Sequence, residues 1–315
     1  MSKRISIIIP VYNEADNLQH LYEEIRKAIS DLRKKYRFEM IFVNDGSTDN
    51  TAKILSAWAA KNKKVKYLEF SRNFGKEMAT TAGIHHSRGD AAIMMDADMQ
   101  HPPNLIGTLI KKWEKGDEMV IGVRKTGNHE TITRKFFSFV FYRILKKIGD
   151  TEIIASSTDY RLIDKKVIRE FIKFTERNRM TRGLLDWMGF KRGIVYFKAG
   201  VRRNGNGRYS YIKLLQLAVS GFTSLSYFPL KFAGYLGIII TLVSGTLGLF
   251  IFAEKYLLKD PLNYAFSGPA ILAVINLFLI GIVLSCLGLI TLYIGSIHQE
   301  VVNRPMYVVR KKKNF

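Results

Sequence analysis

The chain has 315 residues, with 49 Lys and Arg against 27 Asp and Glu, and carries a formal net charge of +22 at pH 7. This length suits one large domain with a further element added, and the basic excess indicates either nucleic acid or an anionic membrane surface as a partner. A single cysteine, Cys286, excludes a disulfide within the chain and gives no sign of thiol chemistry. The apolar residues 5–9 are too few for a secretory signal peptide and are followed by Pro10.

The first part of the chain alternates between short apolar runs and stretches with helical spacing of apolar residues. Strands are predicted at residues 5–11, 39–43, 65–70, 91–95 and 119–123, and helices at 14–35, 51–62, 76–87 and 105–115. This order predicts a mostly parallel α/β sheet with helices on both faces. Ligands of such sheets bind beyond the carboxyl ends of the strands, where Pro10, Asp45, Ser71 and Asp96 fall.

Two later segments combine an apolar helical face with basic residues. In residues 134–148, Phe137 and Phe141 share one face while Arg143 lies off it, and residues 211–225 form a second candidate. A helix of this kind either lies in a membrane interface or packs its apolar face against the protein core.

Two stretches near the C-terminal end, residues 232–253 and 261–297, contain no charged residue. At about 1.5 Å rise per residue each can cross a hydrocarbon core of about 30 Å, and the pair favours a membrane hairpin over buried helices of a soluble protein. The hairpin also favours a membrane over nucleic acid as the partner of the basic charge. Basic residues flank the pair while the charges of the connecting loop cancel, so the positive-inside rule places both termini in the cytoplasm.

The expected organisation follows from these stretches. It is a cytosolic domain at 1–210 that includes the amphipathic helix 134–148, a juxtamembrane helix at 211–229, transmembrane helices at about 232–253 and 270–297 within 230–298, and a basic cytoplasmic tail at 299–315. The basic residues 310–313 are expected to anchor this tail at the membrane surface.

Two carboxylates one residue apart, Asp96 and Asp98, follow the apolar run 91–95. At the carboxyl edge of a sheet the two carboxylates repel each other, and a bound cation would offset this repulsion. Hard oxygen ligands suit Mg²⁺ or Mn²⁺, which usually also hold substrate phosphates. The alternative is an ordinary solvated turn.

Two further loops carry polar groups at strand ends. Tyr12 is suited to stacking on a base, and Glu14 to reaching a base or ribose, although an ordinary strand-to-helix turn explains both. Asp45 is placed to accept a hydrogen bond from a base N–H, and Gly46 permits the tight turn after it. A helix cap from Ser47 is the plainer explanation of that second loop.

Together these motifs resemble family 2 glycosyltransferases of the GT-A, Rossmann-like fold. The likeness continues through residues 70–77, Ser-Arg-Asn-Phe-Gly-Lys in their middle, and through residues 157–162, Ser-Thr-Asp-Tyr-Arg-Leu. With the two apolar stretches, the whole chain is similar to the bacterial polyisoprenyl-phosphate glycosyltransferases, relatives of dolichol-phosphate mannose synthase.

The resemblance implies a role for each matching residue. It places the nucleotide-sugar pocket at Pro10, Tyr12, Glu14, Asp45 and Ala97. It places the catalytic centre at Asp96, Asp98, Gln100 and Asp159, with Mg²⁺ or Mn²⁺ on Asp98, the preferred direct ligand, and on Asp96. It places the lipid phosphate at Arg124, Arg134, Arg202 and Arg208. The chain departs from the family's Gly-Glu-Ser-Lys-Tyr at residues 205–209, where Arg208 keeps the positive charge and Gly207 lacks the serine hydroxyl.

The implied reaction is an inverting transfer of a hexose from a nucleotide sugar to polyisoprenyl (undecaprenyl) phosphate on the cytoplasmic face of the plasma membrane. UDP-glucose is the first expectation for the donor and UDP-N-acetylglucosamine the second. A phosphate acceptor is already largely ionised near neutral pH, so Asp159 either orients the sugar or acts as a weak base. The alternatives are transfer to another membrane lipid and a non-catalytic membrane partner module. The resemblance also implies a homo-oligomer, with a tetramer expected.

Overall fold

A computed structural model describes residues 2–125, 154, 157–176, 179–198, 246, 253 and 268–315. The chain divides into two compact units. The first comprises Met1–Arg208 together with Arg304–Phe315, and the second comprises Tyr209–Asn303. The first unit contains the sheet and the candidate site.

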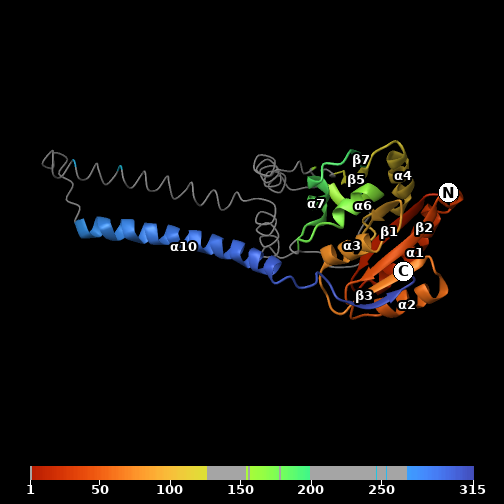
Figure 1. Cartoon of the computed structure of the whole chain (residues 1–315), viewed down its shortest axis with the longest axis horizontal. Helices are drawn as coiled ribbons and strands as arrows, with labels where there is room; N and C mark the ends of the chain where they lie inside the picture. Colours follow the sequence, from red (N-terminus) through yellow and green to blue (C-terminus); the bar gives the residue numbers. More distant parts are fainter. Residues whose placement is uncertain are drawn as a thin grey trace. The chain divides into compact units, whose positions relative to one another are not determined.

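The first unit is built on an eight-stranded sheet in the part of the chain that the structure describes (Figure 1). Its strands are β1 (Arg4–Val11), β2 (Arg37–Asn44), β3 (Val65–Phe70), β4 (Ala91–Met94), β5 (Met119–Arg124), β6 (Ser157–Asp164), β7 (Arg192–Phe197) and β8 (Val309–Lys313). They lie in the order β7-β5-β6-β4-β1-β2-β3-β8, with β6 and β8 antiparallel to their neighbours and the other pairs parallel. The predicted mostly parallel sheet is therefore confirmed.

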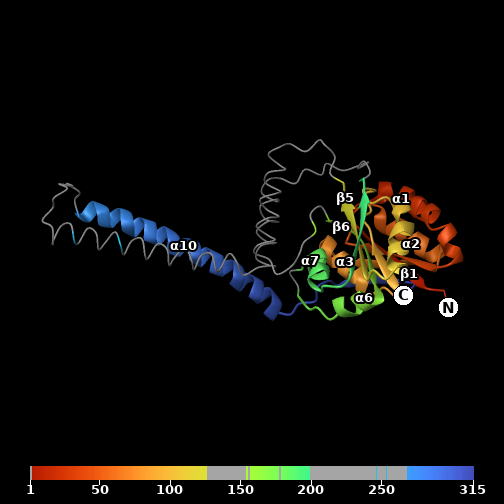
Figure 2. The same ribbon diagram turned by 90° about the horizontal axis from the view of Figure 1, so that it is seen from above.

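Helices cover both faces of this sheet, as the alternation of the sequence predicts (Figure 2). One face is covered by α1 (Ala15–Ala28), α2 (Thr51–Lys61) and α4 (Ile106–Glu114). The other is covered by α3 (Lys76–His85), α6 (Lys165–Phe171) and α7 (Thr181–Trp187). Short 3₁₀ helices, η1 (Asp31–Lys34) and η2 (Pro103–Leu105), follow α1 and precede α4.

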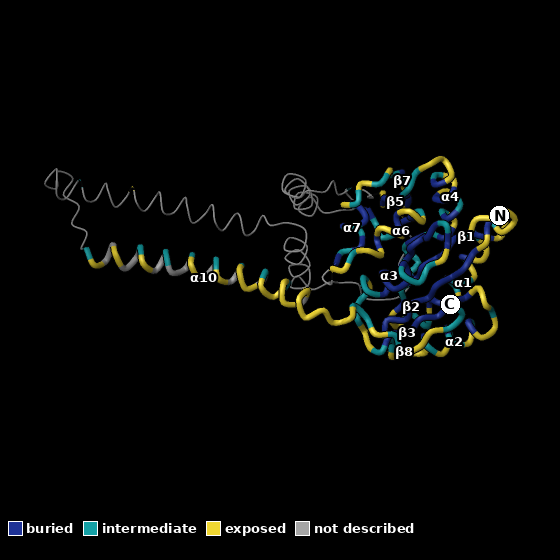
Figure 3. Tube along the Cα trace, in the orientation of Figure 1, coloured by how far each residue is buried: buried dark blue, intermediate teal, exposed yellow. Residues whose placement is uncertain are grey.

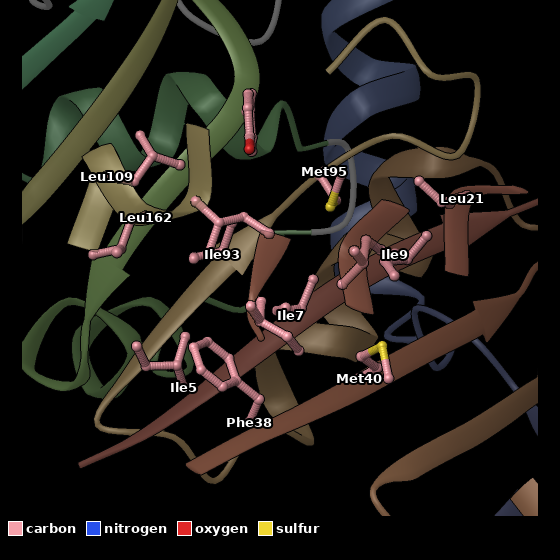
Figure 4. Close-up of a cluster of buried hydrophobic side chains, with 14 of the residues drawn as sticks. Ile5, Ile7, Ile9, Leu21, Phe38, Met40, Ile93, Met95, Leu109 and Leu162 are labelled. Atoms are coloured by element: carbon pink, nitrogen blue, oxygen red, sulfur yellow. The ribbon is translucent and has the colours of Figure 1, made fainter. Parts of the chain in front are cut away.

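The central strand β1 shows why its sequence is apolar at nearly every position. Ile5, Ile7 and Ile9 pack into the cluster under α1 and α4 (Figure 4). Ile8 packs into the cluster under α3. All four are fully buried, and burial of each contributes about 1.5–3 kcal/mol. Figure 3 shows the same strands as a buried layer between more exposed helices. A parallel strand buried on both faces loses the polar alternation of a half-buried one.

The predicted helix at 14–35 ends earlier than its apolar spacing indicates. The α-helical part stops at Ala28, and Ser30 donates its hydroxyl to the carbonyl of Lys27 at 2.8 Å. Such a local hydrogen bond competes with the helical ladder. The chain then continues as η1, while Ile29 stays fully buried in the core.

Strand β6 is inserted between β4 and β5 and was not predicted. Its sequence is polar for a central strand because it carries Arg161, whose guanidinium is completely buried. Arg161 donates from Nη1 to Oδ1 of Asp186 at 2.7 Å and from Nη2 to Oδ2 at 3.2 Å, and both side chains are fully buried. Because Asp186 lies in α7, the positive charge of Arg161 is paired only in the folded chain.

We expect Arg161→Met to lower the free energy of unfolding by about 3–5 kcal/mol, because it leaves the carboxylate of Asp186 buried without its cation. Urea denaturation of the full chain, followed by tryptophan fluorescence, measures this. The double variant Arg161→Met/Asp186→Leu is the control, and it should recover most of the loss because it removes both charges. Equal loss in the single and the double variant would show that packing, not the unmatched charge, sets the cost.

The end of the chain returns to the sheet as an edge strand that the sequence did not predict, while the membrane-surface anchor at 310–313 stays a prediction. Strand β8 pairs antiparallel with β3, and just before it Tyr307 stacks on Phe70 with ring centroids 5.0 Å apart. Asn314 then donates to the carbonyls of Ala59 and Val65 at 2.6 and 2.8 Å. The strand was not predicted because four consecutive basic residues do not indicate a strand. Lysines on an edge strand instead prevent its pairing with further strands.

The second unit contains α10 (Gly268–Val301), a helix of 34 residues that includes the predicted span at 270–297. The predicted span at 232–253 lies outside the described residues apart from Thr246 and Ala253, and the segments 134–148 and 211–229 lie wholly outside them. Among the helices of the described residues, none was found to be both long enough and apolar enough to cross a membrane. The transmembrane hairpin stays a prediction.

Candidate functional site

The loops after β1 and β2 are bound to each other at the carboxyl edge of the sheet. Asn13 adopts a φ of +54° and accepts from the backbone N–H of Thr48 at 2.8 Å, while its own N–H donates to Ser47 Oγ at 3.0 Å. The N–H of Glu14 donates to Thr51 Oγ1 at 3.0 Å. The Asn-Asp-Gly-Ser-Thr segment therefore fixes the turn that presents Tyr12, whose side chain is 45% exposed. An exposed ring on a fixed loop is available to stack on a base.

Asp45 makes its hydrogen bonds to the protein backbone. It is buried, and its two oxygens accept from the N–H groups of Phe74 and Gly75 at 2.7 and 2.9 Å. Burial raises the pKa of Asp45 despite these bonds. The residue predicted to bind a nucleotide base thus fixes the loop between β3 and α3. Gly46, at a φ of +68°, lies so close to the backbone of Arg72 that a Cβ atom would overlap it.

That loop delivers Lys76, the first residue of α3, to the centre of the site. Its ammonium lies 2.7 Å from Oδ1 of Asp96 at the end of β4 and 2.7 Å from Oδ2 of Asp159 in β6. Burial opposes the charge of Lys76, but the two carboxylates outweigh it and raise its pKa. Burial likewise opposes the charge of Asp159, yet Lys76 lowers its pKa. Lys76 therefore joins two predicted catalytic carboxylates that come from different strands.

The second carboxylate of the pair is bound differently. Asp98 accepts from the backbone N–H of Gln100 at 3.1 Å and from its side-chain amide at 3.0 Å, across a turn in which Met99 has a φ of +64°. Both donors are neutral groups of the same turn, which orients the carboxylate of Asp98. Asp98 and Gln100, which the sequence assigns to one site, are in direct contact.

His101 binds the backbone of the acidic turn at Asp96. Its Nδ1 accepts from the backbone N–H of Asp96 at 2.9 Å, and its ring stacks on Tyr160 with centroids 5.0 Å apart. Burial lowers the pKa of His101, so the neutral ring is the form that accepts this bond at neutral pH. Tyr160 in turn donates its hydroxyl to the carbonyl of Pro102 at 3.0 Å.

Sequence reasoning missed Lys76, His101 and Tyr160 as members of this site. Two signals were available. Lys76 lies in the segment 70–77 that carries the family resemblance, and His101 follows directly on the acidic motif. Neither position by itself specifies a partner.

Asp96 and Asp98 offer the hard oxygen donors that Mg²⁺ and Mn²⁺ prefer. Within the described residues no group of three or more His, Cys, Asp or Glu side chains is arranged to hold a metal ion. The pair fits a cation that takes its other ligands from phosphate and water, which is how Mg²⁺ is usually bound. Lys76 would have to share or release Asp96 when such an ion binds.

The remaining predicted residues divide by location. Pro10 lies at the end of β1, Ala97 is almost fully buried between the two acids, and Arg124 is exposed at the end of β5. Arg134, Arg202 and Arg208 lie outside the described residues.

Comparisons with known proteins point to one family. The profile of "Glycosyl transferase family 2" matches residues 6–172. The chain is 40% identical over 313 residues to the uncharacterised glycosyltransferase YkcC of Bacillus subtilis (strain 168), covering 99% of this chain and 95% of that protein. It is 35% identical over 308 residues, 98% of each protein, to the SfII prophage-derived bactoprenol glucosyl transferase of Shigella flexneri. A solved structure of glucosyl-3-phosphoglycerate synthase from Mycobacterium tuberculosis is similar with a TM-score of 0.46 and 17% identity over 69% of this chain and 75% of that one.

Proposed function

Because the chain belongs to glycosyl transferase family 2, we propose that it transfers a hexose, glucose first among the candidates, from a UDP-sugar to undecaprenyl phosphate. The observation that carries the acceptor is the full-length similarity to a bactoprenol glucosyl transferase. The site is compatible with it, since three carboxylates and one ammonium gather at the ligand-binding edge of the sheet.

In the proposed reaction an oxygen of the lipid phosphate attacks the anomeric carbon from the face opposite the nucleotide. The bond from that carbon to the diphosphate breaks, the diphosphate leaves with the electron pair, and the configuration inverts. Asp98 and Asp96 would hold a divalent cation, which would neutralise the charge that develops on the leaving diphosphate. Positioning and charge neutralisation do most of the work, because the acceptor is already an anion.

The contact with Lys76 supports one of the two roles left open for Asp159. A carboxylate whose pKa is lowered by an ammonium 2.7 Å away holds its negative charge and is a poor proton acceptor near neutral pH. We therefore assign Asp159 to orienting the sugar and stabilising positive charge at the anomeric carbon.

The membrane arrangement belongs to the same proposal. A lipid acceptor keeps its phosphate at headgroup level, so the carboxyl edge of the sheet has to reach the cytoplasmic surface of the bilayer. The proposed hairpin at 230–298 and the amphipathic segments 134–148 and 211–229 are the parts of the sequence able to bring it there.

The test uses the purified full chain, undecaprenyl phosphate and radiolabelled UDP-glucose or UDP-N-acetylglucosamine. The proposal predicts lipid-extractable label, more from UDP-glucose, that mild acid releases as free sugar. Label from UDP-N-acetylglucosamine alone would reassign the donor. No lipid label from any nucleotide sugar would favour the non-catalytic membrane module.

Arg124→Ala should raise the KM for the lipid phosphate about tenfold or more, because a charge-assisted hydrogen bond to phosphate is lost, and should leave UDP affinity nearly unchanged. Steady-state kinetics with a short, water-soluble prenyl phosphate measures this. Lys125→Ala, which removes an exposed cation from the next position, is the control. A fall in UDP affinity with an unchanged acceptor KM would contradict the assignment.

A further inference from the structure

A basic cavity lies at the amino edge of the sheet, at the opposite end of β1 and β2 from the carboxylates. It has a volume of about 470 Å³ and opens where β1, β2 and β3 begin. Its lining includes seven cationic side chains. One of them, Lys66, is paired with Glu39. The other six are here called the amino-edge cluster: Arg4, Arg33, Arg37, Lys63, Lys64 and Arg88. A neighbouring cavity of about 630 Å³ shares Arg4, Arg37 and Arg88 with it.

The charge of this cluster is only partly offset by carboxylates in the part of the chain that the structure describes: Asp90 and Asp164 line the neighbouring cavity, and Asp90 accepts from the backbone N–H of Arg4 at 2.9 Å. The one carboxylate in the lining, Glu39, is buried and already bound by Lys66 at 2.9 Å and by the hydroxyl of Ser6 at 2.6 Å. Arg4 reaches Glu39 only at 4.0 Å. No described carboxylate forms an ion pair with the other five cations of the amino-edge cluster. Like charges gathered around a concavity repel one another and focus a positive potential into it.

The shape and the aromatic content of the cavity narrow the class of ligand. A volume of about 470 Å³ is in the range of small-molecule sites. The two rings in the lining, Tyr36 and Phe38, are 4% and 8% exposed, so they offer little surface for base stacking. Recognition of single-stranded nucleic acid relies on such stacking. The chemistry present is cationic, with amides from Asn62 and Asn314 beside it.

We propose that the amino-edge cavity is a binding site for a soluble polyphosphate anion of nucleotide size, read through its phosphates and not through a base. The site is separate from the transferase centre. Strands β1 and β2 each have eight residues, which at about 3.3 Å per residue set their two ends roughly 23 Å apart. The proposal is therefore independent of the sugar and of the acceptor.

The test is isothermal titration of the full chain in non-ionic detergent with sodium tripolyphosphate, in the presence of EDTA so that no metal bridges the anion to Asp96 and Asp98. Arg37→Glu/Arg88→Glu should weaken binding at least about tenfold, because two favourable charges become two repulsive ones. Lys53→Glu/Lys111→Glu is the matched control. It changes the net charge equally at exposed residues of α2 and α4 outside both cavities, and should stay within about twofold of the unmodified chain.

Two further measurements fix the interpretation. ATP should bind with an affinity close to that of tripolyphosphate, whereas tight ATP binding without tripolyphosphate binding would overturn recognition through phosphates. Both double variants should keep the thermal unfolding temperature and the transferase rate of the unmodified chain, which shows that they are folded. The proposal fails if the unmodified chain does not bind tripolyphosphate, or if the control variant loses as much affinity as Arg37→Glu/Arg88→Glu.

Discussion

Lys76→Met should lower kcat about 100-fold or more, the scale of losing one electrostatic group from a catalytic centre. The ammonium bridges Asp96 and Asp159 at 2.7 Å each, so a neutral side chain leaves two carboxylates from different strands without the cation that holds them together. Steady-state transfer to a soluble prenyl phosphate measures the loss. Lys76→Arg is the matched control, and it should keep more activity than the Met variant because it keeps the charge, although its planar group does not reproduce the geometry.

The pH dependence of kcat/KM separates this role from a structural one. Lys76 lowers the pKa of Asp159, so in the unmodified chain Asp159 stays ionised as the pH falls from 8 to about 5. Without Lys76 that pKa rises, and the acidic limb of the profile should move to higher pH. The free energy of unfolding also falls at acidic pH. The contribution of Asp159 to it is fully present above the unfolded pKa of Asp159 and is lost as the pH falls through its lower folded pKa. An unshifted profile in Lys76→Met would show that Lys76 does not control Asp159.

The parts of the fold that the sequence predicted depend on local patterns. Strands buried on both faces, such as β1, leave a continuous apolar run, and the helices between them leave helical spacing. The parts it did not predict depend on partners far along the chain. Arg161 does not indicate a buried strand, because its partner Asp186 lies 25 residues later in the sequence. The sequence of β8 indicates a charged tail, because its pairing with the edge of β3 has no local signal.

The candidate site shows the same division. Asp96 and Asp98 could be found because they follow a predicted buried strand, whereas Asp159 was found only through the family resemblance, since β6 was not predicted. The base-binding role of Asp45 stays a prediction. Its hydrogen bonds to the backbone N–H groups of Phe74 and Gly75 could not be predicted, because backbone groups carry no signature in a sequence. Through these bonds Asp45 holds the loop that ends in Lys76.

Asp98→Asn should abolish transfer, with a loss of roughly 1,000-fold or more, because neutralising a leaving diphosphate through a metal contributes several kcal/mol. The two acids are not equivalent. Asp96 is bound by the ammonium of Lys76, whereas Asp98 accepts from the backbone and side-chain amides of Gln100 and is the acid to which we assign the metal. Asn keeps the shape of Asp98 and removes its charge.

The measurement pairs transfer with binding. EDTA should stop transfer by the unmodified chain, and Mg²⁺ or Mn²⁺ should restore it. Mn²⁺ should also strengthen UDP binding by the unmodified chain and fail to do so in Asp98→Asn. Asp31→Asn, an exposed acid in η1, is the control and should behave as the unmodified chain. Full turnover in chelator would remove the metal from the mechanism. Lys76 would then be the cation the site uses, since it already lies 2.7 Å from Asp96, the acid expected to share the metal.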